Sequence, residues 1–171
     1  MGPHVSAGAD TRLLLDALRR IVQALRESAR DAERHAGITG AQLFVLHTLA
    51  EAPALALNEV AARTHTHQSS ASTVVAQLVA RGLVRRQRSA VDGRQIDLSL
   101  SPRGRHLARQ APDTAQMRLV AAVHQLPPSH RRMLATRLAE LAGALDTVER
   151  IPPMFFEERA GRARQTRGRR G

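Results

Sequence analysis

The feature that most limits the possible fold is a change in the side-chain repeat after Gly82. Up to that residue the apolar positions recur every three to four residues, whereas residues 84–88 and 96–100 alternate between two faces. A period near 3.6 indicates a helix and a period of two indicates a strand. The segment between the two alternating runs contains Asp92-Gly93, a dipeptide that favours a tight turn. The sequence therefore predicts one β-hairpin with an Arg-rich tip.

The apolar residues on both sides of this hairpin have helical spacing. Gly and Pro residues stand near the expected helix ends, and Thr39 with Gln42 has the spacing of a capping box. On the second of these helices, we expect Leu43, Leu46, Leu49 and Ala50 to face the protein interior. Six helices are predicted, at about 10–35, 39–52, 57–64, 68–81, 102–126 with an interruption at Pro112, and from Pro128 onward.

The composition restricts the core and the chemistry of this 171-residue chain. Aromatic residues make up 2% of the sequence, so the core must be built from aliphatic side chains, a composition that favours helices. Because the chain has no Cys, thiolate zinc sites, disulfide scaffolds and cysteine nucleophiles are excluded. There is no uncharged apolar run of about 18 residues and no apolar signal core. We expect a soluble, cytoplasmic protein with no membrane partner.

The net charge of +11 is carried by Arg alone, and its distribution is uneven. Residues 1–56 are neutral, whereas residues 57–105 contain eight Arg and three acids, and residues 151–171 contain six Arg and two acids. A chain with this balance is expected to bind a polyanion. The last segment has Arg and Gly without apolar periodicity, which predicts a disordered tail.

Two short predicted helices lie directly before the hairpin, joined by His65-Thr66-His67. The second begins with small polar residues, an order typical of a helix-turn-helix. Backbone N–H groups at a helix start favour phosphate, and Gln and Ser side chains are suited to base edges in a major groove. The alternative is an ordinary polar helix start.

The whole arrangement resembles the MarR-type (multiple antibiotic resistance regulator) transcription factors. The resemblance rests on Gly82-Leu83-Val84-Arg85-Arg86, on Asp92-Gly93-Arg94 and on the segment after the hairpin, Ser101-Pro102-Arg103-Gly104-Arg105, and it covers about residues 10–150. It implies a mainly α fold with a small β-hairpin wing, in which a winged helix-turn-helix is flanked by terminal dimerisation helices. The implied division is 1–36 for the N-terminal dimerisation helix, 37–107 for the DNA-binding domain, 108–150 for the C-terminal dimerisation helices and 151–171 for the tail.

The resemblance and the residue chemistry together give two sets of candidate DNA contacts. In the wing, Asp92 is expected to orient Arg88 or Arg94 by an ion pair, although Asp-Gly is also simply good turn chemistry. Thr73 and Gln77 stand where the family often has basic residues, and Thr64 and His65 stand where it has an apolar residue and Gly, so base preference cannot be transferred. The predicted contacts are Gln68, Ser69, Ser70, Ser72, Thr73 and Gln77 in the recognition helix and Arg86, Arg88, Asp92 and Arg94 in the wing.

A ligand pocket is predicted near the junction of the first two helices. His35 and His47, with Arg34 and Phe44, have the chemistry to bind an aromatic carboxylate; the alternative is that they are hydrogen-bonded polar residues between helices. His65 and His67 have the spacing of two metal ligands, but no Cys or nearby acid completes a set, so we expect no metal and no cofactor. With no Gly-rich phosphate loop and no nucleophile elbow, we expect no enzyme activity.

The predicted function follows from these features. A homodimer formed by the terminal helices would place two recognition helices roughly 34 Å apart on double-stranded DNA and prefer a pseudo-palindromic operator. The resemblance to the family implies a repressor that is released from DNA by a small aromatic or lipophilic effector. The alternative is an architectural protein that coats DNA without sensing a ligand.

Overall fold

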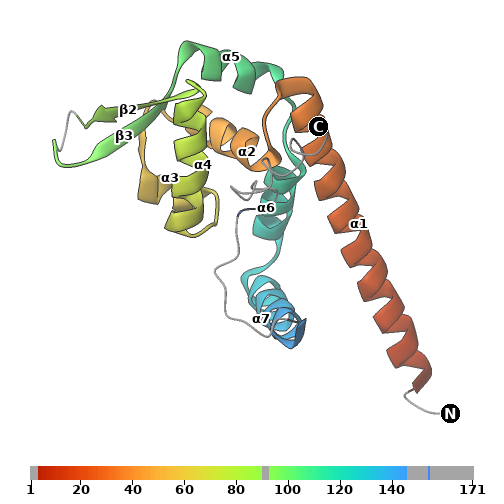
Figure 1. Ribbon diagram of the computed structural model, residues 1–171. Coiled ribbons are helices and arrows are strands. Elements are labelled where there is room, and N and C mark those ends of the chain that lie inside the picture. Colours follow the sequence, from red (N-terminus) through yellow and green to blue (C-terminus); the bar gives the residue numbers. More distant parts are fainter. Residues whose placement is uncertain (1–3, 90–92, 146–153, 155–171) are drawn as a thin grey trace, which may run out of the picture.

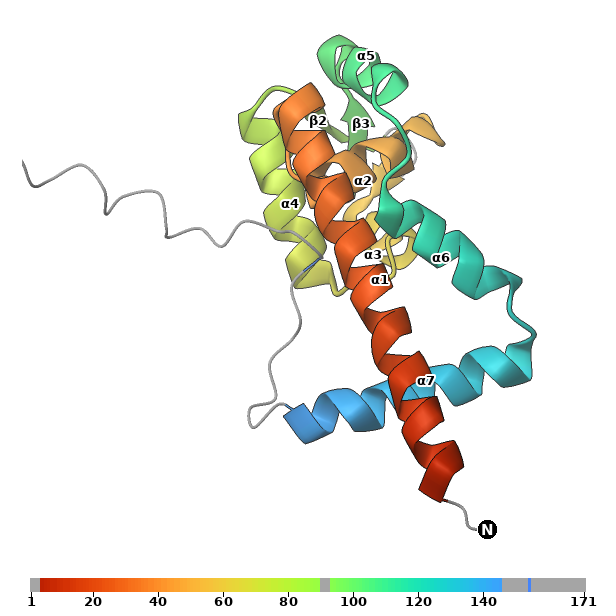
Figure 2. The same ribbon diagram turned by 90° about the vertical axis from the view of Figure 1, so that its right-hand side faces the viewer.

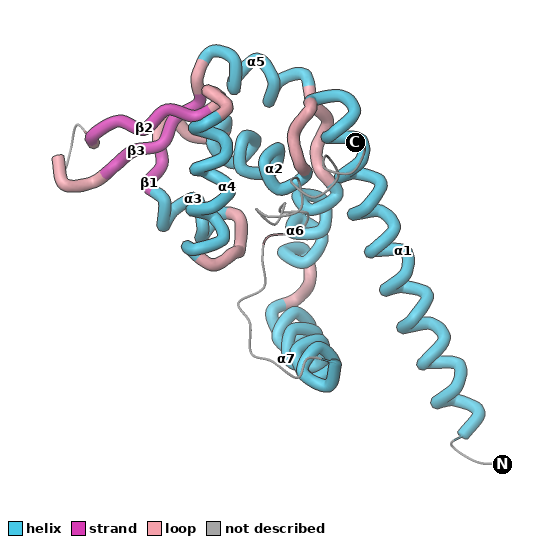
Figure 3. The backbone as a smooth tube through the Cα atoms, viewed as in Figure 1, coloured by secondary structure: helices cyan, strands magenta, loops and turns pink. Residues whose placement is uncertain are grey.

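The computed structural model describes residues 4–89, 93–145 and 154, and these form a mainly helical chain with one small sheet (Figures 1 and 3). The fold class predicted from the sequence is confirmed. Among the described residues, none of the helices combines the length and the apolar content that a membrane span requires. The elements are α1 (His4–Ala36), α2 (Gly40–Ala50), β1 (Leu55–Ala56), α3 (Leu57–Arg63), α4 (Gln68–Ala80), β2 (Val84–Arg88), β3 (Ile96–Leu100), α5 (Pro102–Gln110), α6 (Ala115–Gln125) and α7 (Pro128–Leu145).

The local signals read from the sequence define the helix ends. Thr39 caps α2, and both hydrogen bonds of the predicted capping box with Gln42 are present. Helix α4 ends before Gly82, whose φ of 67° lies in the left-handed region that glycine adopts without steric cost. The change from helix to strand after this residue is confirmed.

The sheet has one strand that the sequence analysis did not predict. The strand order is β1-β3-β2, with both pairs antiparallel, and the short β1 pairs Leu55 with Leu98. Two residues are too few to show a period of two. The strand forms because the edge of β3 that does not pair with β2 hydrogen-bonds to the segment that leads into α3.

The segment from Pro102 to Leu126 is interrupted around Pro112, as predicted, and forms two helices, α5 and α6. Pro112 lies in the break, and Thr114 caps α6 by accepting a hydrogen bond from the Met117 N–H. The N–H of Ala115 donates to Ser28 Oγ of α1 at 2.9 Å. The new helix start is therefore satisfied both by its own cap and by a side chain of α1.

The core lies around α2, which packs against α1, α3, α4, α5, α6 and β3. The expectation that this helix buries one face is too narrow, because Phe44 and Val45 are buried together with Leu46, whereas Ala50 is exposed. A helix enclosed on several sides needs no single apolar stripe. We call residues 37–110, which contain α2 to α5 and the sheet, the central lobe.

The terminal helices extend away from the central lobe. The buried residues of α1, Leu25, Ala29 and Ala32, lie in its C-terminal half, where α1 packs against α2 and α6. The rest of α1 continues past the lobe (Figures 1 and 2). Helix α7 has no buried residue. Within the predicted tail the structure describes Met154 alone, which is 3% exposed and belongs to the core cluster.

Candidate nucleic-acid interface

Helix α4 presents one exposed face made of small, uncharged side chains. Its first residues Gln68 and Ser69 are exposed, Ser72 is half-buried, and Thr73 is exposed one turn further on. The Thr73 hydroxyl donates to the Ser69 carbonyl at 3.1 Å, which fixes its orientation on the helix. Small side chains on one helical face allow close approach to the edges of bases in a major groove.

Two of the predicted recognition residues face the protein. Ser70 is 7% exposed and lies on the buried side of α4. Gln77 is half-buried, and its Oε1 accepts a hydrogen bond from Nε2 of Gln42 on α2 at 2.8 Å. These positions connect the helix to the lobe, while Gln68, Ser69, Ser72 and Thr73 remain on its accessible side.

Polar groups fasten the C-terminal end of α4 to the junction between α1 and α2. The guanidinium of Arg81 donates to Gln42 Oε1 at 3.3 Å and to the carbonyl of Gly37. Gln42 is 3% exposed and also completes the capping box of Thr39. A buried side chain thus joins the start of α2 to α4, which makes the position of α4 depend on the α1–α2 junction.

The strands of the wing divide its Arg residues between two faces. In the β2–β3 register Arg86 lies opposite Leu98 and Arg88 opposite Ile96, so both lie on the sheet face of the buried Leu98. Arg85 lies opposite Ser99 on the other face. All three are exposed, and the hairpin extends beyond the helices (Figure 1). Positive charge therefore surrounds the hairpin instead of lining one side of it.

The base of the wing is fixed to the end of α4. Ser101 is 5% exposed, caps α5 by accepting from the Gly104 N–H, and donates its hydroxyl to the Gly82 carbonyl at 2.8 Å. The Ser101 N–H donates to the Leu83 carbonyl. Because these bonds join both ends of the hairpin to the recognition helix, the wing and α4 are held in one geometry.

The tip of the wing is described only in part. Arg94 is exposed beyond the turn, as a phosphate contact requires. Asp92 lies outside the described residues, so the predicted ion pair with Arg88 or Arg94 stays a prediction.

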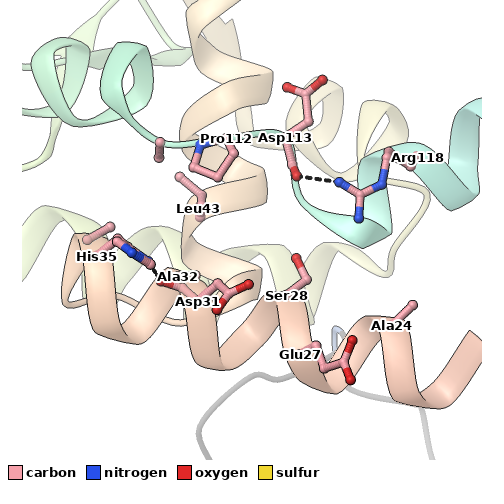
Figure 4. A pocket seen from close by; sticks show the side chains of 12 residues that line it. Ala24, Glu27, Ser28, Asp31, Ala32, His35, Leu43, Pro112, Asp113 and Arg118 are labelled. Carbon is pink, nitrogen blue, oxygen red and sulfur yellow. Dashed lines mark hydrogen bonds between the residues drawn. The ribbon is translucent and has the colours of Figure 1, made fainter.

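The residues predicted for a ligand pocket do not come together in one cavity. One cavity, of about 290 Å³, lies between α1, α2 and the α5–α6 connection. His35 lines it together with Asp31, Leu43 and Arg118 (Figure 4). Of the other three, Arg34 is exposed and paired with Asp31, Phe44 is a core residue, and His47 is half-buried.

The His47 side chain shows one unsatisfied polar atom. Its Nε2 is buried and has no hydrogen-bond partner among the described residues. We call the cavity beside His35 the α1 cavity.

The turn before α4 holds a histidine in an unusual backbone conformation. His65 has a φ of 51°, and its ring meets the ring of His124 on α6 edge to face, with centroids 4.9 Å apart. His67 is the N-cap position of α4 and is exposed, without a side-chain cap bond. No cluster of three or more metal-ligating side chains occurs in the described ranges.

Sequence reasoning missed two parts of this interface. Ala76 and Ala80 extend the exposed face of α4, and their helical spacing from Ser69 and Thr73 was a usable signal. The link between Gln42, Gln77 and Arg81 had no such signal, because it joins residues 35 and 39 positions apart.

Known proteins are similar to this chain in sequence and in fold. The family model of the MarR family matches residues 36–95. The chain is 32% identical to the uncharacterized HTH-type transcriptional regulator ML2140 of Mycobacterium leprae over 126 residues, which cover 74% of this chain and 87% of that protein. It is 34% identical to the HTH-type transcriptional repressor MdtR of Bacillus subtilis over 96 residues, 56% of this chain and 60% of that protein.

A solved structure extends the likeness to the fold. BpsR of Bordetella bronchiseptica, whose DNA binding is described as regulated by 6-hydroxynicotinic acid, matches with a TM-score of 0.52 and 26% identity, covering 77% of this chain and 91% of that one. With its DNA-binding winged helix-turn-helix and these relatives, the chain belongs to the MarR family of helix-turn-helix transcriptional regulators.

Proposed function

We propose that the protein is a homodimeric, sequence-specific regulator that binds double-stranded DNA at a pseudo-palindromic operator. The observation that carries this proposal is the pairing of a small, uncharged, exposed face on α4 with an Arg-rich wing fixed to the same helix. The face has the chemistry to read bases, and the wing has the charge to bind phosphates. A protein that only coats DNA needs the second feature and not the first.

The exposed apolar residues support a dimer built from the terminal helices. Leu134, Leu138 and Leu141 of α7 are 38–44% exposed, as are Ile21 and Val22 of α1 at 40% and 42%. Contiguous exposed apolar surface of this kind marks an interface. A two-fold dimer would repeat the α4 face on a second half-site roughly one DNA turn, about 34 Å, away.

The proposed mode of action is repression relieved by a small aromatic or lipophilic ligand. MdtR is named a repressor, and BpsR responds to an aromatic acid. A ligand changes DNA affinity only if it binds the two states of the protein unequally. The link from α1–α2 to α4 through Gln42 and Arg81 supports this mode, because it gives a route from the terminal helices to the recognition helix.

Binding to the chain's own promoter region, compared with random DNA over a range of salt concentrations, tests the proposal. We expect a preference of at least about 10³-fold for the specific site at physiological salt. A ratio near one at every salt concentration would show that the protein is an architectural DNA-binding protein.

Two substitutions separate phosphate binding from base reading. Arg94→Ala should weaken binding to all sequences and lower the salt slope by about 1, whereas Gln68→Ala should relax specificity at one position per half-site. Arg30→Ala is the matched control, since Arg30 is exposed on α1, and α1 lies on the opposite side of the lobe from the hairpin (Figure 1). An unchanged salt slope in Arg94→Ala would show that the wing does not contact phosphate.

A further inference from the structure

Ile96 of the wing is a large apolar side chain that neither the core nor the proposed dimer uses. It is 46% exposed, and the other large exposed apolar side chains of the described residues belong to α1 and α7. Those two helices lie away from the hairpin (Figure 1). A single exposed apolar residue is ordinary on a protein surface, so the neighbours of Ile96 decide whether it has a role.

The neighbours of Ile96 on its sheet face are arginines. In the β2–β3 register Ile96 lies directly opposite Arg88, and Arg86 stands two positions away on the same face. Directly opposite residues have Cβ atoms roughly 5 Å apart, and residues two positions apart along a strand are separated by roughly 7 Å. We call Arg86, Arg88 and Ile96 the outer wing face. It places one apolar side chain beside two guanidinium groups.

The reverse face of the hairpin differs in charge. It carries Arg85 opposite Ser99 and Gln87 opposite Asp97. The carboxylate of Asp97 repels a phosphate group, whereas no acidic residue of the two strands lies on the face of Ile96. DNA is therefore bound more favourably by the outer wing face than by the reverse face.

The outer wing face also lies on the side of the sheet that α4 covers. At the base of the hairpin this sheet face carries Val84 and Leu98, which are buried in one cluster with Val74 and Leu78 of α4. The hairpin continues past the helices, so the outer end of this face is left uncovered (Figures 1 and 3). A duplex bound along the exposed side of α4 therefore meets the outer wing face, while Arg85 lies on the reverse face.

From this arrangement we propose that the outer wing face binds in the minor groove beside each half-site and that Ile96 makes the protein prefer A·T pairs there. Arg86 and Arg88 contact the phosphates, and Ile96 lies in the groove. A G·C pair presents an N2 amino donor in the minor groove that an A·T pair lacks. An apolar side chain against this donor removes its water and supplies no acceptor, which disfavours G·C.

This inference rests on the proposed function and names the residue that selects the sequence beside the half-sites. Apolar side chains, Ile among them, are used in minor grooves by other DNA-binding proteins. The selection acts through a group that A·T pairs lack, so it differs from the reading of base edges by α4 in the major groove.

Three versions of the operator test the role of the N2 amino group. They differ only in the pairs of the minor-groove segment that is protected outside each half-site, which are A·T, G·C or inosine·C. Inosine is a guanosine without the amino group. We expect similar affinity for the A·T and inosine·C versions and about tenfold weaker binding to the G·C version, the cost of one unpaired buried donor. Equal affinity for the G·C and inosine·C versions would overturn the proposal.

Variants of Ile96 test the residue itself. Ile96→Thr keeps a β-branched side chain in the strand and adds a hydroxyl that accepts a hydrogen bond from the amino group. It should reduce the G·C penalty to less than about threefold, whereas Ile96→Val should keep most of it. Both variants should keep the urea midpoint of the parent chain, because Ile96 is outside the core cluster.

Arg94→Ala separates Ile96 from a second way of preferring A·T pairs. A narrow A·T-rich minor groove attracts Arg side chains, so Arg94 is the competing candidate. The G·C penalty should persist in Arg94→Ala although the affinity for every duplex falls. A penalty that Arg94→Ala removes and Ile96→Thr leaves unchanged would assign the selection to Arg94 and overturn the role of Ile96.

The arginines of the two faces test which face meets DNA. Arg86→Ala and Arg88→Ala should each lower the salt slope by about 1, because each removes one phosphate contact. Arg85→Ala is the matched control on the reverse face and should leave the slope unchanged. An equal fall in Arg85→Ala and Arg88→Ala would contradict the assignment of the face.

Random duplexes separate this inference from the proposed function. If the parent chain does not prefer its operator but binds random inosine·C duplexes more tightly than G·C duplexes, and Ile96→Thr removes the difference, the proposed function fails and the role of Ile96 stands. If the operator is preferred and the flanking pairs have no effect, the proposed function stands and this inference fails. A change of oligomeric state in Ile96→Thr, measured by analytical ultracentrifugation, would show that a second copy covers Ile96 and would overturn its role in the groove.

Discussion

The central lobe and the terminal helices use the same aliphatic composition in opposite ways. In the lobe, Leu46, Val60, Val74 and Leu78 are 0% exposed. In α1 before Leu25 and throughout α7, leucines at helical spacing remain exposed, and Ile96 of the wing is the one large exposed apolar residue of the described ranges that lies elsewhere. An apolar stripe therefore predicts that a helix face will be buried, but not whether the same chain supplies the covering surface.

The first way to sharpen this contrast is to remove core volume from the lobe. Leu46→Ala should lower the free energy of unfolding by about 2–5 kcal/mol, because the fully buried site in α2 cannot collapse around the missing atoms. Urea denaturation followed by circular dichroism measures it. Leu145→Ala, at a side chain that is 85% exposed, is the matched control. Equal losses in the two variants would contradict the division between the regions.

The second way is to charge the face that lacks a cover. Leu138→Glu on α7 should weaken the proposed dimer by about 1.5–3 kcal/mol per subunit, the value of burying one Leu side chain. Analytical ultracentrifugation over a range of protein concentrations measures the shift. The lobe should keep its circular dichroism spectrum and its urea midpoint when the chains separate. A dimer that is unaffected would place the interface on another surface.

The third test concerns the close contact between α5 and the base of the wing. A Cβ built on Gly104 would lie 2.1 Å from the Leu83 carbonyl oxygen, so one of two backbone segments must shift. Gly104→Ala should therefore destabilise the chain by about 1–3 kcal/mol, the usual cost of overpacking. Thermal unfolding and operator affinity should fall together, because Leu83 also anchors the wing. Unchanged stability would mean that this contact is looser than the structure indicates.

The fourth test removes the cap that starts α2. Thr39→Ala loses the hydrogen bond from the Gln42 N–H to the Thr39 hydroxyl and should reduce stability by about 1 kcal/mol. Thr39→Ser keeps a hydroxyl at the same position and should restore most of the loss. Urea midpoints of the three proteins provide the comparison, and an alanine variant as stable as the parent would show that the cap is dispensable.

The smallest effect is expected in α7. Gly143 has open space around its Cβ position, and glycine within a helix is less favourable than alanine. Gly143→Ala should stabilise the helix by about 0.5–1 kcal/mol, read as a higher helical signal and melting temperature. A loss of dimer in this variant would show that a partner packs closely against Gly143.

The features that the sequence determined by itself depend on residues that are close together in the chain, within one helical turn or one hairpin. The Thr39 capping box, the end of α4 before Gly82 and the pairing of β2 with β3 follow from residues a few positions apart, and all three are present. Charge by segment likewise predicted the Arg-rich wing. The sequence alone was therefore enough to locate the predicted DNA-binding helix and the hairpin along the chain.

Only the tertiary structure decided which of those residues face outward and what else surrounds them. It turned Ser70 inward and bonded Gln77 to Gln42, 35 residues away, and it added β1 to the free edge of β3. It also brought His65 to His124, which made a cavity where the sequence showed a polar turn. The physical reason is that local hydrogen bonding and side-chain repeats act over a few residues, whereas burial and charge clustering depend on segments that meet only when the chain packs.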